Sequence, residues 1–185
     1  IMSRLPDRLR IKENYYVLYG TGSSMPTGIT VGASAWSDTL ADSKVQRLDV
    51  LHAAVTQLRT AYYQPNAILL NPADAQVLRL LKTESDYQYF NLQWVVGGTN
   101  PMIAGVPVIE TADVTSGDFI VGDFRKGATI RERKGSTIEM TNYNEDNFIK
   151  GMVTVRGSYR IAVENHNPSA FVYDTFTAAL AKGSA

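Results

Sequence analysis

Apolar residues recur at short intervals along residues 146–163, which read DNFIKGMVTVRGSYRIAV. This pattern predicts one unbroken strand of about eighteen residues, where about five or six are usual. At ~3.3 Å per residue, such a strand would reach roughly 55–60 Å. A compact globule of this chain's size has a radius of gyration of only ~16 Å, so the strand must project from the molecule or span it.

A second strand-like run starts at Gly127 and reads GATIRERKGSTIEMTNY, with an expected break at Lys134–Gly135. It meets the first run across NYNED, so the two together predict a long antiparallel hairpin. Ile138 and Met140 alternate with polar neighbours, as expected for a sheet with one covered face and one face in water.

The rest of the chain carries shorter helical and strand patterns. Residues 1–19 predict the last turns of a helix that began upstream, and residues 42–62 predict a second helix with one apolar face. The short strand NAILL is followed by NPADAQVLRLLK, a helix for which Asn71 is the N-cap and Pro72 the first residue. Strands in GVPVIETADV, GDFIVGDF and NPSAFVYDTF complete an α/β unit into which the hairpin is inserted.

Composition excludes several classes of function. Lys plus Arg and Asp plus Glu are 18 each, so the chain lacks the basic excess of a protein that coats nucleic acid. Cysteine is absent, and His52 and His166 are far apart in sequence, which makes a zinc site improbable. No apolar run is long enough to predict a membrane span. The glycine-rich stretch GTGSSMPTGIT lacks the Gly-Lys-Ser/Thr ending of a phosphate-binding loop, so turn chemistry explains it better.

Few residues suggest catalysis. Glu110, Asp118 and Asp123 could serve as paired carboxylates, but nothing in their spacing brings two of them together. A catalytic site is therefore not predicted, and no cofactor is implied.

Two groups of residues suggest contacts with other molecules. Arg156 and Arg160 lie four apart on a strand and so share a face, where they could hold phosphate or the carboxylates of a neighbouring subunit. The neutral overall charge favours the carboxylates. Tyr87, Phe90 and Trp94 are candidates for contacts between subunits, or they fill the core, because no basic track accompanies them for binding nucleic acid.

The long hairpin itself predicts self-association. Exposed edges of extended strands recruit other chains, and a projection of this size cannot bury both faces within its own domain. Another copy of the protein is the simplest cover. An assembly protein is therefore the leading hypothesis from the residues alone.

The order of the segments resembles a known family. NPADAQVLRLLKTES, GVPVIETADV, FIVGDF, the hairpin sequence and NPSAFVYDTF together are similar to the carboxy-terminal half of tailed-bacteriophage major capsid proteins, the family with the Hong Kong phage capsid fold. The opening SRLPDRLRIKENYYVLYGTGSSMPTGI resembles the spine helix of that family and the glycine loop after it. The motifs are individually loose, and their order and spacing carry the resemblance.

The resemblance implies an α+β fold of two domains. Residues 20–130 and 166–185 would form an axial α/β domain that meets its copies around five-fold and quasi-six-fold axes. Residues 1–19, the end of the spine helix, and the hairpin 131–165 would form a peripheral domain. The amino-terminal arm, an extended loop and the start of the spine helix are missing, so we expect a fragment that assembles poorly alone.

The implied function is structural. The chain would be a subunit of an icosahedral phage or prophage head, forming pentamers and hexamers that enclose double-stranded DNA without sequence-specific contact. Scaffold, portal and decoration proteins are further candidate partners, and no membrane is involved. The expected location is the virion, with the host cytoplasm during assembly.

A cross-linking member of this family joins a lysine of the extended loop to an asparagine beside the long strand, assisted by a glutamate. By local alignment, Gly151 stands at the asparagine position and Ser158 at the glutamate position. Glycine has no side-chain amide and serine cannot replace a carboxylate as a base. We therefore expect no self-cross-linking.

Two alternatives remain open. The same fold serves encapsulin-type bacterial compartments, which a neighbouring cargo-enzyme gene would reveal. Less favoured is an α/β enzyme that uses Asp118, Asp123 or His166.

Overall fold

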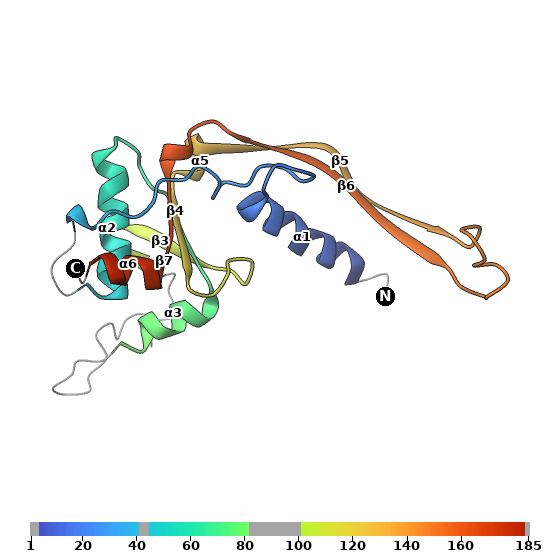
Figure 1. The fold of residues 1–185 in the computed structure, drawn as a ribbon, viewed down its shortest axis with the longest axis horizontal. Helices are drawn as coiled ribbons and strands as arrows, with labels where there is room; N and C mark the ends of the chain where they lie inside the picture. Colours follow the sequence, from blue (N-terminus) through green and yellow to red (C-terminus); the bar gives the residue numbers. More distant parts are fainter. Residues whose placement is uncertain (1–3, 41–44, 82–100, 184–185) are drawn as a thin grey trace. The chain divides into compact units, whose positions relative to one another are not determined.

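The computed structural model describes residues 4–40, 45–81 and 101–183. It divides into two compact units, each built from two stretches of the chain (Figure 1). The hairpin unit comprises Ile1–Gly28 and Ile130–Glu164, and the sheet unit comprises Ile29–Thr129 and Asn165–Ala185. The chain leaves the sheet unit after Thr129 and returns to it at Asn165, so the hairpin is an insertion.

The loop after the first helix lies in the hairpin unit, whereas the sequence-based division placed residues 20–28 with residues 29–130. The loop folds back on itself: Gly28 N donates to Gly20 O at 2.8 Å, and Thr21 and Thr27 form a β-bridge. These local bonds attach the loop to the end of the helix.

The sheet unit is built on a five-stranded sheet of order β2-β3-β1-β4-β7. β1 runs parallel to β3 and antiparallel to β4, and the β2–β3 and β4–β7 pairs are also antiparallel. The predicted return of the last strand to the α/β unit is confirmed, because β7 pairs with β4. The strands are β1 (Ala67–Leu70), β2 (Met102–Ile103), β3 (Val106–Glu110), β4 (Asp118–Gly122) and β7 (Phe171–Thr175).

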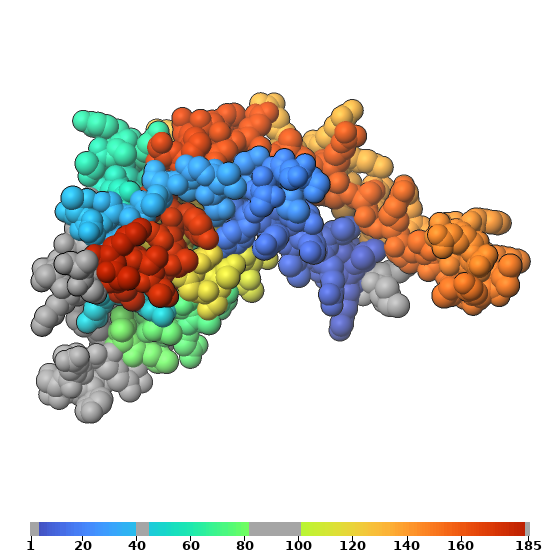
Figure 2. Space-filling model, viewed as in Figure 1, coloured from blue at the N-terminus to red at the C-terminus, as the bar shows by residue number. Residues whose placement is uncertain are grey.

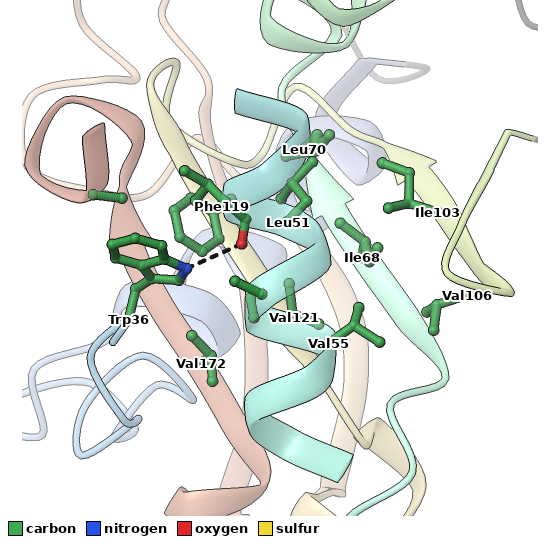
Figure 3. Packing of buried hydrophobic residues seen from close by; sticks show 14 of the residues in the cluster. Trp36, Leu51, Val55, Ile68, Leu70, Ile103, Val106, Phe119, Val121 and Val172 are labelled. Carbon is green, nitrogen blue, oxygen red and sulfur yellow. Dashed lines mark hydrogen bonds between the residues drawn. The ribbon is translucent and has the colours of Figure 1, made fainter. Parts of the chain in front are cut away.

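Helix α2 (Arg47–Thr60) packs its apolar stripe against this sheet (Figure 3). Leu51 and Val55 are fully buried against strand residues such as Ile68 and Val121. The helix begins later than predicted: residues 42–44 lie outside the described part, and Gln46 is extended as the N-cap. Gln46 N donates to the Asp49 carboxylate at 2.9 Å, which satisfies an amide at the helix start.

Short helices surround the sheet. α3 (Pro72–Arg79) begins as predicted, since the Asn71 side chain accepts a hydrogen bond from Ala73 N. The others are α5 (Phe124–Gly127), α6 (Phe176–Lys182) and the 3-10 turns η2 (Asp38–Leu40) and η3 (Pro168–Ala170).

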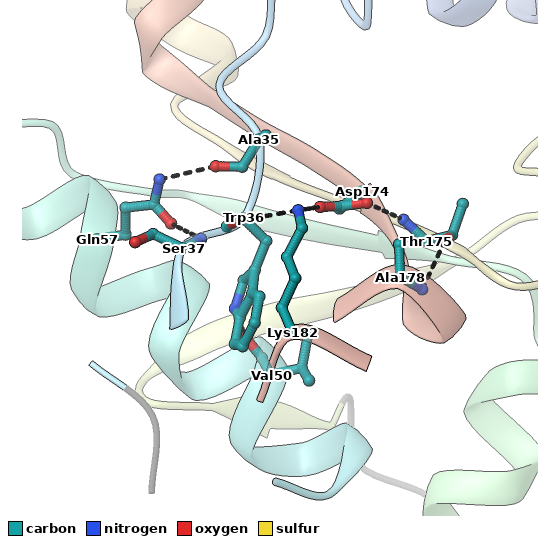
Figure 4. A network of polar contacts seen from close by, with 9 residues as sticks. All are labelled: Ala35, Trp36, Ser37, Val50, Gln57, Asp174, Thr175, Ala178 and Lys182. Carbon is teal, nitrogen blue, oxygen red and sulfur yellow. Dashed lines mark hydrogen bonds and ion pairs between the residues drawn. The ribbon is translucent and has the colours of Figure 1, made fainter. Parts of the chain in front are cut away.

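Polar contacts attach the segment before α2 to the rest of the sheet unit (Figure 4). Trp36 is 2% exposed, and its Nε1 donates to Val50 O at 3.0 Å. Lys182 Nζ lies 2.7 Å from the Asp174 carboxylate and 3.4 Å from Trp36 O. The same lysine therefore joins α6, β7 and the Trp36 segment.

The hairpin unit contains α1 (Leu5–Tyr19) and two long strands, β5 (Ala128–Thr141) and β6 (Thr154–Asn165). The strand predicted over residues 146–163 begins only at Thr154, because residues before it form a turn. Lys150 N donates to Asp146 O at 3.0 Å, and Glu145 and Gly151 have φ values of 48° and 64°. The expected break at Lys134–Gly135 is wrong, since β5 continues through it.

Candidate interaction surface

The register of the hairpin is fixed by side-chain pairs between β5 and β6. Arg131 Nε lies 2.8 Å from the Glu164 carboxylate, Ser158 and Thr137 hydroxyls are 3.5 Å apart, and Arg156 Nη2 lies 2.6 Å from the Glu139 carboxylate. The three pairs share one antiparallel register: as the position in β5 rises, the position of its partner in β6 falls by the same number of residues. Because side chains alternate between the faces of a strand, these six residues share one face.

The opposite face of the hairpin contacts α1. A Cβ placed on Gly157 would lie 2.8 Å from Leu9 Cδ1, so helix and strand approach closely there. Tyr159, two residues further, donates its phenol hydrogen to Glu13 Oε1 at 2.5 Å. We call this the inner face and the face with the ion pairs the outer face.

The pKa of Tyr159 reflects this contact. Burial, the hydrogen bond to Glu13 and the nearby charges of Glu13 and Glu132 raise the pKa of the phenol to about 12, against the opposing effect of Arg10. The effects that raise the pKa outweigh that of Arg10 and favour the neutral phenol, which is the form that donates to Glu13.

The outer face holds Arg156 and Arg160, the two arginines singled out from the sequence. Arg156 is paired with Glu139 on its own hairpin, so its charge is partly satisfied within the chain. Arg160 is exposed and makes no ion pair with another described residue. Their spacing of four residues predicted that the two arginines share one face. Only the pairing of β5 with β6 shows that Arg156 has a partner on its own hairpin.

The turn between the strands exposes large apolar side chains. Tyr143, Phe148 and Ile149 are 86%, 73% and 85% exposed, and Met152 and Val153 are about half exposed. In the space-filling view the turn forms the orange end of the hairpin (Figure 2). Contiguous exposed apolar groups of this kind mark sites of interaction with other molecules. The apolar residues of this turn are visible in the sequence as NFIKGMV, but the prediction assigned them to a continuous strand instead of an exposed turn.

The three aromatic residues proposed as contacts, Tyr87, Phe90 and Trp94, lie outside the described residues. Their role stays a prediction.

Asp118 and Asp123, two of the candidate catalytic acids, make hydrogen bonds within the fold. Asp118 begins β4 and accepts a hydrogen bond from the Tyr173 phenol at 3.1 Å. Asp123, beyond the other end of β4, caps α5 by accepting from Arg125 N and Lys126 N. Five residues of strand separate the two by ~17 Å, so they do not converge on one substrate.

His166 belongs to the sheet unit and directly follows β6 in sequence. Its Nε2 is 3.1 Å from the Thr129 hydroxyl, and its backbone N donates to Gly127 O. Among the described residues, no three His, Asp or Glu side chains gather as metal ligands. Within the same part of the chain, every helix is too short or too polar to cross a membrane.

Comparison with known proteins identifies the family. Residues 1–176 match the model of the phage capsid family. The major capsid protein of Enterobacteria phage HK97 is 29% identical over 183 residues, which cover 96% of this chain and 46% of that protein. The chain therefore spans less than half the length of this curated relative.

Solved structures show the same fold. A chain from Gordonia phage Cozz superposes with a TM-score of 0.72 at 18% identity, covering 94% of this chain and 62% of that one. The capsid of an empty GTA particle, computed with C5 symmetry, superposes with a TM-score of 0.71 at 18% identity. The match covers 95% of this chain and 64% of that chain. A chain from Mycobacterium phage Ogopogo superposes with a TM-score of 0.71 at 13% identity, and the match covers 94% of this chain and 67% of that chain. The predicted α+β capsid fold is confirmed, and the chain belongs to the phage capsid family.

Proposed function

We propose that this chain is the carboxy-terminal part of a major capsid protein, a structural subunit of a tailed-phage or prophage head. One observation carries the proposal: a long two-stranded hairpin ends in a turn whose large apolar side chains are uncovered. In a member of the phage capsid family, other copies of the same protein are the natural cover.

The physical argument rests on the strands. A two-stranded ribbon is marginally stable by itself, and among the described residues each of its strands has one edge without a partner strand. Unpaired edges and apolar groups such as Phe148 and Ile149 favour association. Assembly into a shell would cover both.

In this proposal the sheet unit is the axial domain and the hairpin unit is the peripheral domain. Sheet units would meet around five-fold and quasi-six-fold axes to form pentamers and hexamers, and hairpins would contact neighbours between them. The shell would enclose double-stranded DNA, with scaffold, portal and decoration proteins as further partners. It would assemble in the host cytoplasm and persist in the virion.

The shell would be held by noncovalent contacts. Gly151 lies in the turn with φ 64° and has no side-chain amide to form an isopeptide bond. Ser158 lies on the outer face beside the Thr137 hydroxyl, where the assisting carboxylate would be needed. Denaturing gels of assembled particles should therefore give one monomer band, and a ladder of covalent multimers would contradict this.

Electron microscopy of the full-length protein that contains this chain tests the proposal. Closed shells in the purified product are expected. A product that stays monomeric over a wide range of protein and salt concentrations, with and without its co-expressed neighbours, would overturn it.

A further inference from the structure

Two arginines on the outer face of the hairpin have no ion-pair partner among the described residues. Arg160 makes no ion pair with a described residue, and neither does Arg133, which is also exposed. The register places Arg160 opposite Gly135 and Arg133 opposite Ala162, so the residue directly opposite each arginine has no side-chain group that can accept its hydrogen bonds.

The other four charged side chains on this face form the two ion pairs already described, Arg131 with Glu164 and Arg156 with Glu139. Between these pairs the outer face therefore presents two guanidinium groups that form no ion pair within the described part of the chain. Such a group prefers a carboxylate, which it can bind through two hydrogen bonds, and also stacks on aromatic rings.

The turn of the hairpin carries both a carboxylate and aromatic rings. Glu145 is exposed, makes no ion pair with a described residue, and sits in the left-handed region at φ 48°. The rings of Tyr143 and Phe148 on either side of it are 86% and 73% exposed. The turn thus carries a free carboxylate between two free aromatic faces.

The turn cannot reach the arginines of its own hairpin. From Arg160 to the beginning of β6 at Thr154 is a distance of ~20 Å along an extended strand. The two surfaces can meet only if they belong to different molecules.

We propose that the turn of one copy, through Tyr143, Glu145 and Phe148, docks on Arg133 and Arg160 of a second copy. This rests on the proposed function and names the chemistry of one subunit contact within it. The two surfaces differ, so the contact is head-to-tail: each copy gives its turn to one neighbour and its arginines to another. Contacts of this type close into rings or continue as chains.

Site-directed cross-linking tests the contact directly. This chain has no cysteine, so once any cysteine elsewhere in the full-length protein is replaced by serine, only the introduced pair can react. Glu145→Cys and Arg160→Cys are combined in the full-length protein, and assembled particles are treated with a short bis-maleimide. This reagent replaces the length of the two removed side chains, whereas a direct disulfide needs Cα atoms within ~7 Å. The expected result is a ladder of covalent multimers on a denaturing gel.

The matched control pairs Glu145→Cys with Lys134→Cys, which lies next to Gly135 but on the inner face. It should give mostly monomer. Equal ladders from the two pairs, or none from the Arg160 pair in particles that have assembled, would overturn the proposed contact.

Charge reversal provides an independent measurement. Glu145→Lys alone, or Arg133→Glu with Arg160→Glu, should lower the yield of assembled particles by about tenfold or more, since like charges then face each other. Combining all three substitutions in one chain restores opposite charges and should restore the yield. Circular dichroism confirms that each variant is folded.

The outcomes separate the two proposals. If the wild-type protein forms no shells, the proposed function fails and the contact fails with it. The other outcome is that wild-type shells form while the triple variant gives no higher yield of particles than Glu145→Lys alone or Arg133→Glu with Arg160→Glu. In that case only the proposed contact between the turn and the arginines is wrong.

Discussion

The phenol of Tyr159 on β6 donates a hydrogen bond to the carboxylate of Glu13 on α1, with 2.5 Å between the two oxygens. These residues are far apart in sequence, and their bond joins the helix to the inner face of the hairpin. Next to it, Gly157 leaves room for Leu9 of the same helix. Both a polar and an apolar contact between α1 and β6 therefore help to hold the hairpin unit together.

The first prediction concerns pH. Because the pKa of Tyr159 is raised from 10.0 to about 12 in the folded chain, its contribution to stability is complete below pH 10 and is lost as the pH rises toward 12. The free energy of unfolding of the wild-type chain should exceed that of Tyr159→Phe by roughly 1 kcal/mol at pH 9. This difference should shrink between pH 10 and 12.

Chemical denaturation at several pH values measures that difference. Tyr62→Phe is the control, since Tyr62 is 97% exposed and the loss of its hydroxyl should leave the free energy of unfolding unchanged. A difference between wild type and Tyr159→Phe that stays constant up to pH 12 would show that the phenol is not held neutral by Glu13.

The second prediction concerns a buried carboxylate in the sheet unit. Asp74 is 5% exposed, lies 2.9 Å from Arg47 Nη1 and accepts a hydrogen bond from Gly117 N at 2.6 Å. Asp74→Ala leaves Arg47 and the Gly117 amide without this partner. It should lower the free energy of unfolding by about 3 kcal/mol.

Urea denaturation of Asp74→Ala and Asp74→Asn together identifies the cause. The asparagine keeps an oxygen for Gly117 N, so it should recover part of the loss. If both variants unfold at the wild-type urea concentration, the ion pair and its amide contact contribute nothing measurable.

The third prediction compares two glycines that have no room for a side chain. A Cβ on Gly127 would lie 2.4 Å from the ring of Phe171, which is fully buried and cannot move aside. Gly127→Ala should therefore cost roughly 1–3 kcal/mol through overpacking. A Cβ on Gly157 meets only the end of the flexible Leu9 side chain, so Gly157→Ala should cost less than about 1 kcal/mol.

Thermal denaturation of the two alanine variants provides the comparison, with each transition assigned to its unit by hydrogen exchange. A larger loss for Gly157→Ala than for Gly127→Ala would reverse the expected order. It would mean that the α1–hairpin contact is packed more rigidly than the Phe171 ring.

The fourth prediction concerns the exposed turn. Phe148→Ser with Ile149→Ser should change the free energy of unfolding by no more than ~0.5 kcal/mol, because both side chains are already in water. The same change should reduce self-association of the full-length protein, measured by sedimentation velocity and electron microscopy.

Val77→Ser is the control for the turn variant. Val77 is 45% exposed on α3 in the sheet unit, and its loss should leave assembly unchanged. Normal shells from the Phe148 and Ile149 variant would show that the turn is not an essential contact.

Sequence patterns were sufficient for the elements that depend on neighbouring residues. The cap at Asn71, the strands β1, β3, β4 and β7, and the alternation of Ile138 and Met140 with polar residues are local features, because each is decided by residues a few positions apart. The resemblance to capsid proteins likewise followed from the order of these segments.

Other features were decided only by tertiary structure. The turn before Thr154 was missed because its apolar residues continue the pattern of the strand, and the interruption lies in the backbone at Glu145 and Gly151. The partner of Arg156 and the freedom of Arg160 follow from which residues of β5 stand opposite them. Strand register joins residues distant in sequence, and a shift of one position moves every side chain to the other face. The sequence alone therefore determined that a long amphipathic hairpin exists, whereas the pairing of its strands decided which charges are left for a neighbour.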